Sequence, residues 1–197
     1  MSTTAIPAAF FDAVEARPRS AKTRTFEMVK AFADRIFSVA KHITQNDDDA
    51  TDVLIETFLR VCPDLWGSGQ DEKVWLRLVS IAVTEAFSKL CKRGEGRFPP
   101  DQDADPCDDV VIRELSVWGD GYPQCYSPER TNDILEHGLR SLDPMCRTVF
   151  VLRDIEEIPV KHIARIVKRS VAAVEVCLLR ARLQLREALA RQMRQVQ

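Results

Sequence analysis

Two segments near the C-terminus carry apolar residues at helical spacing and are separated by only a short break. Ile163, Ile166 and Val167 repeat at intervals of three and four residues, which is the spacing of one face of a helix. After the break a longer stripe follows, formed by Val174, Leu178, Ala181, Leu185 and Leu189. A connection this short between two amphipathic helices needs a tight turn, so the sequence predicts a helix-turn-helix.

Residues typical of helix starts stand at both helices of this pair. Ser170 precedes the longer helix and is predicted to be its N-cap, and Pro159 suits the first turn of the shorter one, where a missing N–H costs nothing. Upstream, Val149, Phe150 and Leu152 form an apolar face that supports the pair. We expect a small helical bundle whose last helix stays partly exposed, a geometry that the major groove of DNA admits.

The first half of the chain contains three more apolar stripes at helical spacing. They comprise Phe26, Val29, Phe32, Ala33, Ile36, Phe37 and Ala40, then Ala50, Val53, Leu54, Thr57, Phe58 and Val61, and finally Leu78, Ile81, Ala82, Ala86 and Leu90. Three amphipathic helices bury their apolar faces against one another, which predicts a compact bundle. Asp47 to Asp49 stand where the second helix should begin, as caps and as complements to the helix dipole.

The region between these bundles is acidic and rich in proline and glycine. Residues 94–133 carry 3 Lys and Arg against 10 Asp and Glu, whereas residues 134–197 carry 12 against 7. Repeated proline and glycine interrupt helices, which predicts a flexible linker. The expected fold is all-α, with two small helical bundles joined by this acidic linker and a helix-turn-helix in the second. The predicted divisions are an N-terminal extension over 1–24, a first domain over 25–93, the linker over 94–130 and a second domain over 131–197.

The charge pattern suggests binding partners for the basic second domain and for the acidic linker. A basic excess beside a helix-turn-helix suits a phosphate backbone, although solvated helix faces produce similar excesses. In the linker, the acidic run is typical of a solvated loop, and a cation site is the alternative for Asp101, Asp103, Asp105, Asp108 and Asp109. The linker also has the charge needed to screen the basic domain. We therefore expect the free protein to pack its two domains against each other or against a protein partner.

Composition argues against several classes of protein. No apolar run is long enough to span a bilayer and the N-terminus lacks the order of a secretory signal, which predicts a cytoplasmic protein without membrane insertion. The six cysteines, Cys62, Cys91, Cys107, Cys125, Cys146 and Cys177, form no CxxC pair. A thiol or metal sensor that uses them with His42, His137 and His162 is disfavoured because none share ligand spacing. No nucleophile, base and orienting group can be combined, so neither an enzyme nor a bound cofactor is predicted.

The C-terminal segments from Leu142 to Glu156, Ile163 to Val167 and Val171 to Arg186 resemble the promoter-reading domain of the extracytoplasmic-function sigma factors, which recruit bacterial RNA polymerase to promoters. Asp49-Ala50-Thr51-Asp52, followed by Glu56-Thr57-Phe58-Leu59-Arg60, is similar to the family signature that docks on the polymerase clamp. The helical spacing itself places the carboxylates at i, i+3 and i+7 on one face. The resemblance implies polymerase contacts by Asp49, Asp52, Glu56, Phe58 and Arg60.

The third helix resembles the promoter-melting segment of the same family through Ile81 to Ala86 and Lys89 to Arg93. That segment holds unpaired bases by stacking and backbone contacts. The resemblance implies contacts to the −10 element by Trp75, Arg77, Thr84, Lys89, Lys92 and Arg93. The register departs from the family, since its tryptophan falls at Arg77 and its asparagine at Thr84. A core role for Trp75 is the alternative.

The resemblance implies contacts to the −35 element by Lys168, Arg169, Ser170, Ala172, Ala173, Glu175, Arg180 and Arg182. This chain has Glu175 and Cys177 where the family places basic residues, Lys168 where it has a glycine in the turn, and Ile55 in place of a glutamine before Glu56. Phosphates repel a glutamate, but its carboxylate accepts a hydrogen bond from cytosine N4. The departures therefore predict an atypical upstream sequence preference.

Together the two stretches imply a sigma factor without enzymatic activity. Its partners would be bacterial core RNA polymerase, promoter DNA and an anti-sigma factor, with the first domain melting the −10 element and the second reading the −35 element. The alternative is a sigma-like interaction module with degenerate DNA contacts, which binds an anti-sigma factor or polymerase without reading promoters.

Overall fold

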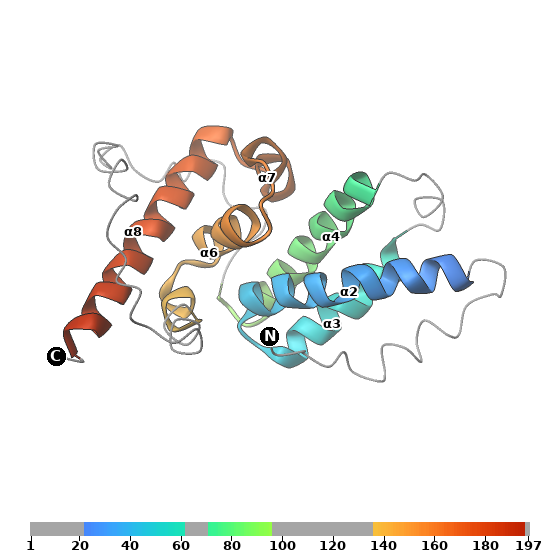
Figure 1. Ribbon diagram of the computed structural model, residues 1–197, viewed down its shortest axis with the longest axis horizontal. Helices are drawn as coiled ribbons and strands as arrows, with labels where there is room; N and C mark the ends of the chain where they lie inside the picture. Colours follow the sequence, from blue (N-terminus) through green and yellow to red (C-terminus); the bar gives the residue numbers. More distant parts are fainter. Residues whose placement is uncertain (1–21, 62–70, 96–135, 196–197) are drawn as a thin grey trace.

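The computed structural model describes residues 22–61, 71–95 and 136–195, and the regular elements in these ranges are all helical (Figure 1). The predicted all-α fold is therefore confirmed. The N-terminal extension up to residue 21 and the acidic stretch over 96–135, with the five aspartates considered for a cation site, lie outside the described residues. None of the described helices is both long and apolar enough to cross a membrane.

Three long helices form the N-terminal bundle: α2 (Lys22–Thr44), α3 (Asp47–Arg60) and α4 (Asp71–Lys92), each packed against the other two. Of its largest fully buried side chains, Ile36, Val53, Leu54, Leu78 and Leu90 come from the predicted apolar stripes. Val39, Ile43 and Phe87 are equally buried but were not part of those stripes. Burial of side chains of this size is the main stabilising contribution to such a bundle.

Only two residues separate the end of α2 from the start of α3. Gln45 takes a left-handed conformation with φ 55°, and Asn46 then caps α3 by accepting a hydrogen bond from the Asp49 amide (2.9 Å). The helix begins at Asp47, as the acidic cluster suggested, but the cap is Asn46 rather than one of the aspartates. Asp47, Asp48 and Asp49 occupy the first turn, where they complement the helix dipole.

The C-terminal bundle contains a helical segment over 136–141, α6 (Pro144–Phe150), the π-helical turn η4 (Val151–Ile155), α7 (Val160–Val167) and α8 (Val171–Gln195). Asp143 caps α6 by accepting from the amides of Met145 (3.0 Å) and Cys146 (3.3 Å). Helix α8 packs on α6 and α7, and the stripe predicted for it is buried from Val174 to Leu185. The side chain of Leu189 lies outside the described residues.

The predicted helix-turn-helix is present in α7 and α8. Lys168 ends α7 in a left-handed conformation (φ 55°), which is the position where glycine is favoured because it has no Cβ. Ser170 caps α8 as predicted, with its hydroxyl oxygen accepting from the Ala173 amide (3.1 Å). Pro159 stands one residue before α7, where its carbonyl accepts from His162 and Ile163.

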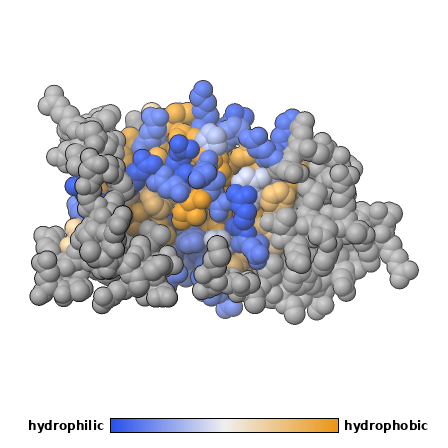
Figure 2. Space-filling model, in the orientation of Figure 1, coloured by the Kyte–Doolittle hydropathy of each residue, from blue (hydrophilic) through white to orange (hydrophobic). Residues whose placement is uncertain are grey.

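The two bundles are in contact, as Figure 1 shows for α4 and α7. Helix α2 also touches α6 and η4. Polar contacts between the described parts of the bundles include the ion pair of Arg35 with Glu156 and the hydrogen bond from Nε of Arg140 to Oε1 of Gln45 (3.3 Å). On the face in Figure 2, hydrophilic side chains cover much of the described surface and apolar atoms show between them. The structure thus has the domains packed against each other, one of the two arrangements expected of the free protein.

Candidate polymerase and promoter contacts

The acidic side chains of α3 face basic side chains of α4. Asp49 pairs with Arg93 (Oδ2 to Nη1, 2.8 Å), and Asp52 pairs with Lys89. Two of the residues predicted to bind polymerase are therefore ion-paired with two of those predicted to bind the −10 element. Such pairs tie two helices together at the bundle surface, although each contributes modestly where solvent reaches it.

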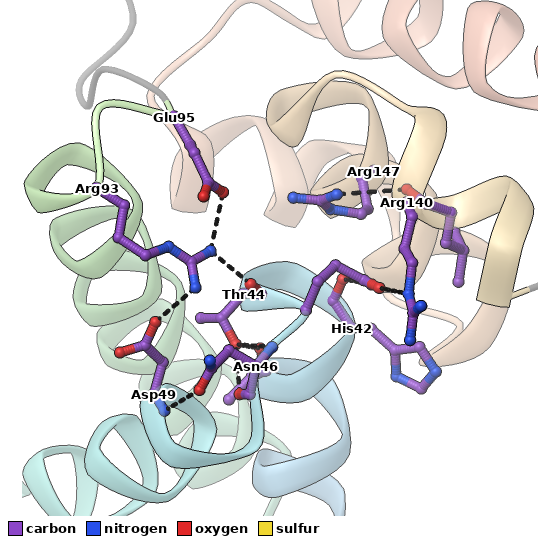
Figure 3. A network of polar contacts seen from close by, with 11 residues as sticks. His42, Thr44, Asn46, Asp49, Arg93, Glu95, Arg140 and Arg147 are labelled. Carbon is purple, nitrogen blue, oxygen red and sulfur yellow. Dashed lines mark hydrogen bonds and ion pairs between the residues drawn. The ribbon is translucent and has the colours of Figure 1, made fainter.

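Arg93 is the most connected residue of this set (Figure 3). Besides Asp49, its guanidinium donates to the carbonyl oxygen of Thr44 (2.6 Å) and to Glu95 (2.8 Å). It thereby fixes the end of α4 to the turn between α2 and α3. A planar guanidinium has enough donors for all three acceptors, so Arg93 holds the N-terminal bundle together in addition to any contact with DNA.

A mixed acidic and apolar face of α3 remains accessible. Asp52, Glu56 and Arg60 are exposed, and Arg60 also pairs with Glu85 of α4. Leu59, which the sequence analysis did not select, is exposed beside them. Asp52, Glu56 and Leu59 stand at i, i+4 and i+7 and so share one face. The sequence signal for Leu59 is that it is an apolar residue that does not fall on the buried stripe of α3.

Other residues of the predicted polymerase set lie deeper. Phe58 is 6% exposed and belongs to the core, so its ring is not available to a partner in this conformation. Asp49 is half-buried under Arg93. Ile55, at the position where the family has a glutamine, packs against the core.

The exposed face of α4 carries three of the residues predicted to contact the −10 element: Arg77, Thr84 and Lys92. Lys73 is also exposed, and it lies on the same face as Arg77 and Thr84, four and eleven residues before them. The sequence analysis missed Lys73, although its spacing from Arg77 was available. This face combines positive charge with short polar side chains, which suits a nucleic-acid backbone.

Trp75 lies inside the N-terminal bundle and is 7% exposed. Phe32 stacks on its ring, with centroids 5.8 Å apart and an interplanar angle of 20°. The guanidinium carbon of Arg35 lies 3.9 Å from the centroid of the Trp75 ring, a cation–π contact. The structure therefore gives Trp75 the core position that was the alternative for it.

Residues at the start of α8 and in the turn before it are exposed. Lys168, Ser170, Ala172 and Glu175 are exposed there. The remaining residues predicted to contact the −35 element are half-buried, namely Arg169, Ala173, Arg180 and Arg182. The accessible end of α8 is thus short, uncharged apart from Glu175, and preceded by basic residues of the turn.

Arg182 is bound within the C-terminal bundle. Its Nε and Nη2 donate to the two carboxylate oxygens of Asp154 in η4 at 2.9 and 2.6 Å. This two-fold hydrogen bond raises the pKa of Arg182 above its ordinary value. A residue predicted to meet DNA phosphates is therefore a tie between η4 and α8 in this structure.

Cys177 is the second departure from the family pattern in α8, and the structure explains it. Its side chain is buried against Cys146 of α6. The hydrogen bond between the two thiols raises the pKa of Cys146 and lowers that of Cys177. Position 177 faces the core in this chain, so the absence of a basic residue there removes no exposed charge.

Arg147 of α6 is a buried cation near the junction of the bundles (Figure 3). Its Nη1 donates to the carbonyl oxygen of Leu139 (3.4 Å), and its Nε has no hydrogen-bond partner. Burial lowers the pKa of Arg147, whereas the nearby charge of Glu95 opposes that shift. Glu95, which also binds Arg93, thus links the end of α4 electrostatically to α6.

Metal-ligating side chains do not cluster in the part of the chain that the structure describes. No group of three His, Cys, Asp or Glu residues there is placed to hold a metal ion. His42, one of the three histidines considered for a sensor, instead has Nδ1 beside the carbonyl oxygen of Ser38 (2.7 Å).

Comparisons with known proteins agree with this architecture. Residues 132–185, which include the helix-turn-helix, match the family model for region 4 of sigma-70. The chain is 30% identical over 172 residues to the ECF RNA polymerase sigma factor SigE of Mycolicibacterium smegmatis. That alignment covers 84% of this chain and 61% of SigE, so the chain spans about three-fifths of that relative's length.

A solved structure shares the fold. The sigma factor RpoE from Bartonella quintana, crystallised with the anti-sigma factor NepR, superposes with a TM-score of 0.56 and 19% sequence identity. The superposition covers 83% of this chain and 95% of RpoE. The chain is thus similar to region 4 of sigma-70 over residues 132–185 and to an extracytoplasmic-function sigma factor over most of its length, and it shares the fold of RpoE.

Proposed function

We propose that this chain is a sigma factor that binds bacterial core RNA polymerase and directs it to specific promoters. The observation that carries the proposal is the coincidence of the region 4 match over residues 132–185 with a helix-turn-helix whose second helix begins in solvent. A separate helical bundle precedes it, in the order that the family uses. One bundle then serves the polymerase clamp and the −10 element, and the other serves the −35 element.

In this proposal the polymerase contact lies on the exposed face of α3 formed by Asp52, Glu56, Leu59 and Arg60. Carboxylates at helical spacing suit a basic partner surface, and an apolar side chain among them adds area that water leaves on binding. Phe58 and Asp49 support this face from behind, because one is buried and the other holds Arg93.

Promoter contacts fall on the two other exposed faces. Arg77, Thr84 and Lys92, joined by Lys73, face the melted −10 element from α4, while Lys89 and Arg93 first have to leave their carboxylate partners. On α8, Ala172, Ala173 and Glu175 read base edges, and Lys168, Arg169, Ser170 and Arg180 position the helix on the phosphates. Arg182 contributes indirectly, by fixing α8 to η4.

An anti-sigma factor is the proposed regulator. The fold matches that of a sigma factor solved with such a partner, and the contacts between the bundles involve α2, α4, α6, η4 and α7. Separation of the bundles then accompanies binding to polymerase.

The second candidate is a sigma-like interaction module without promoter reading. The exposed Glu175 favours it, because a carboxylate at the start of the DNA-facing helix repels phosphates. The two candidates differ in one result: the interaction module binds its protein partner but does not shift or melt any promoter.

Transcription in vitro with purified core polymerase and a library of genomic fragments tests the proposal. We expect discrete transcripts that depend on this chain. Arg180→Ala should weaken initiation on all promoters alike, whereas Glu175→Gln should change which promoters respond. Glu187→Gln on the exposed surface of α8 is the matched control for the charge change. The absence of chain-dependent transcripts would overturn the proposal, and a reversed pattern of the two variants would reassign backbone and base contacts.

A further inference from the structure

A three-residue contact joins the bundles and covers the indole of Trp75. Arg35 of α2 lies over the Trp75 ring at 3.9 Å, and its Nη2 and Nε both donate to Oε2 of Glu156, at 2.8 and 3.2 Å. Glu156 comes from the C-terminal bundle, 121 residues away along the chain. The Glu156 side chain is 8% exposed, while that of Arg35 is 47% exposed. Arg35 is therefore an accessible cation, and its partner, the carboxylate of Glu156 from the other bundle, is almost fully buried.

The loop that carries Glu156 holds this carboxylate in place. The Glu156 amide donates to the carbonyl oxygen of Val151 (3.0 Å) and the Ile158 amide donates to that of Leu152 (2.9 Å). Between them Glu157 adopts a left-handed conformation with φ 57°. Because the backbone is fixed on both sides, we expect the carboxylate to leave Arg35 chiefly when the whole C-terminal bundle moves.

The chemistry of the contact is that of a nucleic-acid backbone site. A phosphate offers a guanidinium the same anionic oxygen acceptors as a carboxylate does. The Trp75 ring is itself buried, and its role is to hold the Arg35 guanidinium in place through the cation–π contact. Trp75 also belongs to α4, the helix proposed to face the −10 element.

We propose that Arg35, stacked on Trp75, binds a backbone phosphate of single-stranded DNA, and that Glu156 occupies this phosphate site while the two bundles are packed together. The inference rests on the proposed function for its biological setting. It assigns a DNA contact to α2, and it makes the C-terminal bundle a competitor for that contact. DNA binding at Arg35 and separation of the bundles then favour each other.

The test measures binding of a fluorescein-labelled single-stranded DNA of mixed sequence to the full chain by anisotropy at low salt. Glu156→Gln removes the competing charge, and Glu157→Gln is the matched control, because this neighbour is exposed and carries the same charge. We expect Glu156→Gln to bind about three- to tenfold more tightly than Glu157→Gln, as for the loss of one charge-assisted competitor. In the Arg35→Gln background this gain should disappear.

A salt titration separates a phosphate contact from a structural effect. Loss of one phosphate contact on a single strand makes the negative slope of log Kobs against log salt shallower by about 0.7, so Arg35→Gln should show that reduction in magnitude. Arg35→Lys keeps the charge and should retain the slope. Equal affinities of the Glu156→Gln and Glu157→Gln variants, a gain that persists without Arg35, or no binding by any variant would each overturn the inference.

The outcome for the proposed function is read separately. Variants that initiate transcription with core polymerase but show no coupling between Arg35 and Glu156 would refute this site and leave the sigma-factor assignment intact. Coupling between Arg35 and Glu156 on single-stranded DNA, in a chain that does not bind core polymerase, would support this site and refute the proposed sigma-factor function.

Discussion

The two bundles differ in how they use the charged residues that the sequence offers to partners. In the N-terminal bundle these residues bond to one another across α3 and α4, through Asp49 with Arg93, Asp52 with Lys89, and Arg60 with Glu85. In the C-terminal bundle, exposed residues predicted to contact the −35 element lie at the turn and at the first residues of α8, and Arg182 bonds internally to Asp154.

This difference affects how substitutions in each bundle are interpreted. A charge in the N-terminal bundle contributes to folding and to binding at once, so loss of activity there does not by itself indicate a lost partner contact. An exposed residue such as Ala172 or Glu175 in the C-terminal bundle has little structural role, and its substitution reports mainly on DNA. The predictions below test this distinction.

The largest expected effect is a loss of stability of the N-terminal bundle, and it tests whether Trp75 is a core residue. Trp75→Ala should destabilise the N-terminal bundle by about 3–5 kcal/mol, because it removes a large buried ring and leaves a cavity beside Phe32. Urea unfolding measures the change. Leu59→Ala, an exposed apolar position in the same bundle, is the control and should cost far less. If the two variants were equally stable, Trp75 would not be a core residue.

A second test concerns Arg93. Arg93→Ala removes the donors to Asp49, Thr44 and Glu95 and should lower the free energy of unfolding by about 2 kcal/mol. Lys92→Ala, at the exposed neighbouring position, should change it by no more than about 0.5 kcal/mol. A normal stability for Arg93→Ala combined with loss of promoter opening would make Arg93 a DNA contact only.

Loss of the ion pair between Arg182 of α8 and Asp154 of η4 should have a smaller effect on stability. Arg182→Ala and Asp154→Asn are each expected to destabilise the C-terminal bundle by about 1 kcal/mol, since the pair is partly exposed to solvent. The double variant should be little worse than either single one, because both remove the same interaction. Additive losses in thermal unfolding would show that the two residues act independently.

The smallest effect is a gain in stability at the turn of the helix-turn-helix. Lys168→Gly should stabilise the C-terminal bundle by about 0.5–1 kcal/mol, because glycine adopts the left-handed conformation without the steric cost of a Cβ. Lys161→Gly inside α7 should have the opposite sign, as glycine destabilises a helix interior. Destabilisation by Lys168→Gly would mean that the lysine side chain stabilises this turn.

The periodicity of apolar residues was sufficient to predict most of the fold. The stripes in α3, α4 and α8 are buried apart from the half-buried Ile81 and from Leu189, whose side chain is not described, and Ser170 caps α8, because these features depend on residues close in sequence. The π-helical turn after Phe150, the Asn46 cap and the left-handed Gln45 were not predicted. The Asn46 cap is a local hydrogen bond of the same kind as the Ser170 cap, and the sequence offered Asn46 beside three aspartates that also suit a cap. The π-helical turn and the left-handed Gln45 are conformations that apolar spacing does not specify.

The candidate site was less predictable than the fold for a related reason. Charged residues at helical spacing indicate a shared face, but not whether that face meets solvent or another helix. The contact of Arg35 with Glu156 spans 121 residues, and only the packing of the bundles reveals it. Phe58 and Trp75 were selected by motif, and the structure places both among buried side chains.

Binding to core RNA polymerase tests the central claim most directly. Purified chain and bacterial core polymerase, mixed at low salt and separated by size exclusion, should elute together. The exposed face of α3 predicts that Glu56→Lys weakens this association, since it reverses a charge that has little role in folding. A chain that elutes alone, with core polymerase unchanged, would contradict the assignment of this protein as a sigma factor.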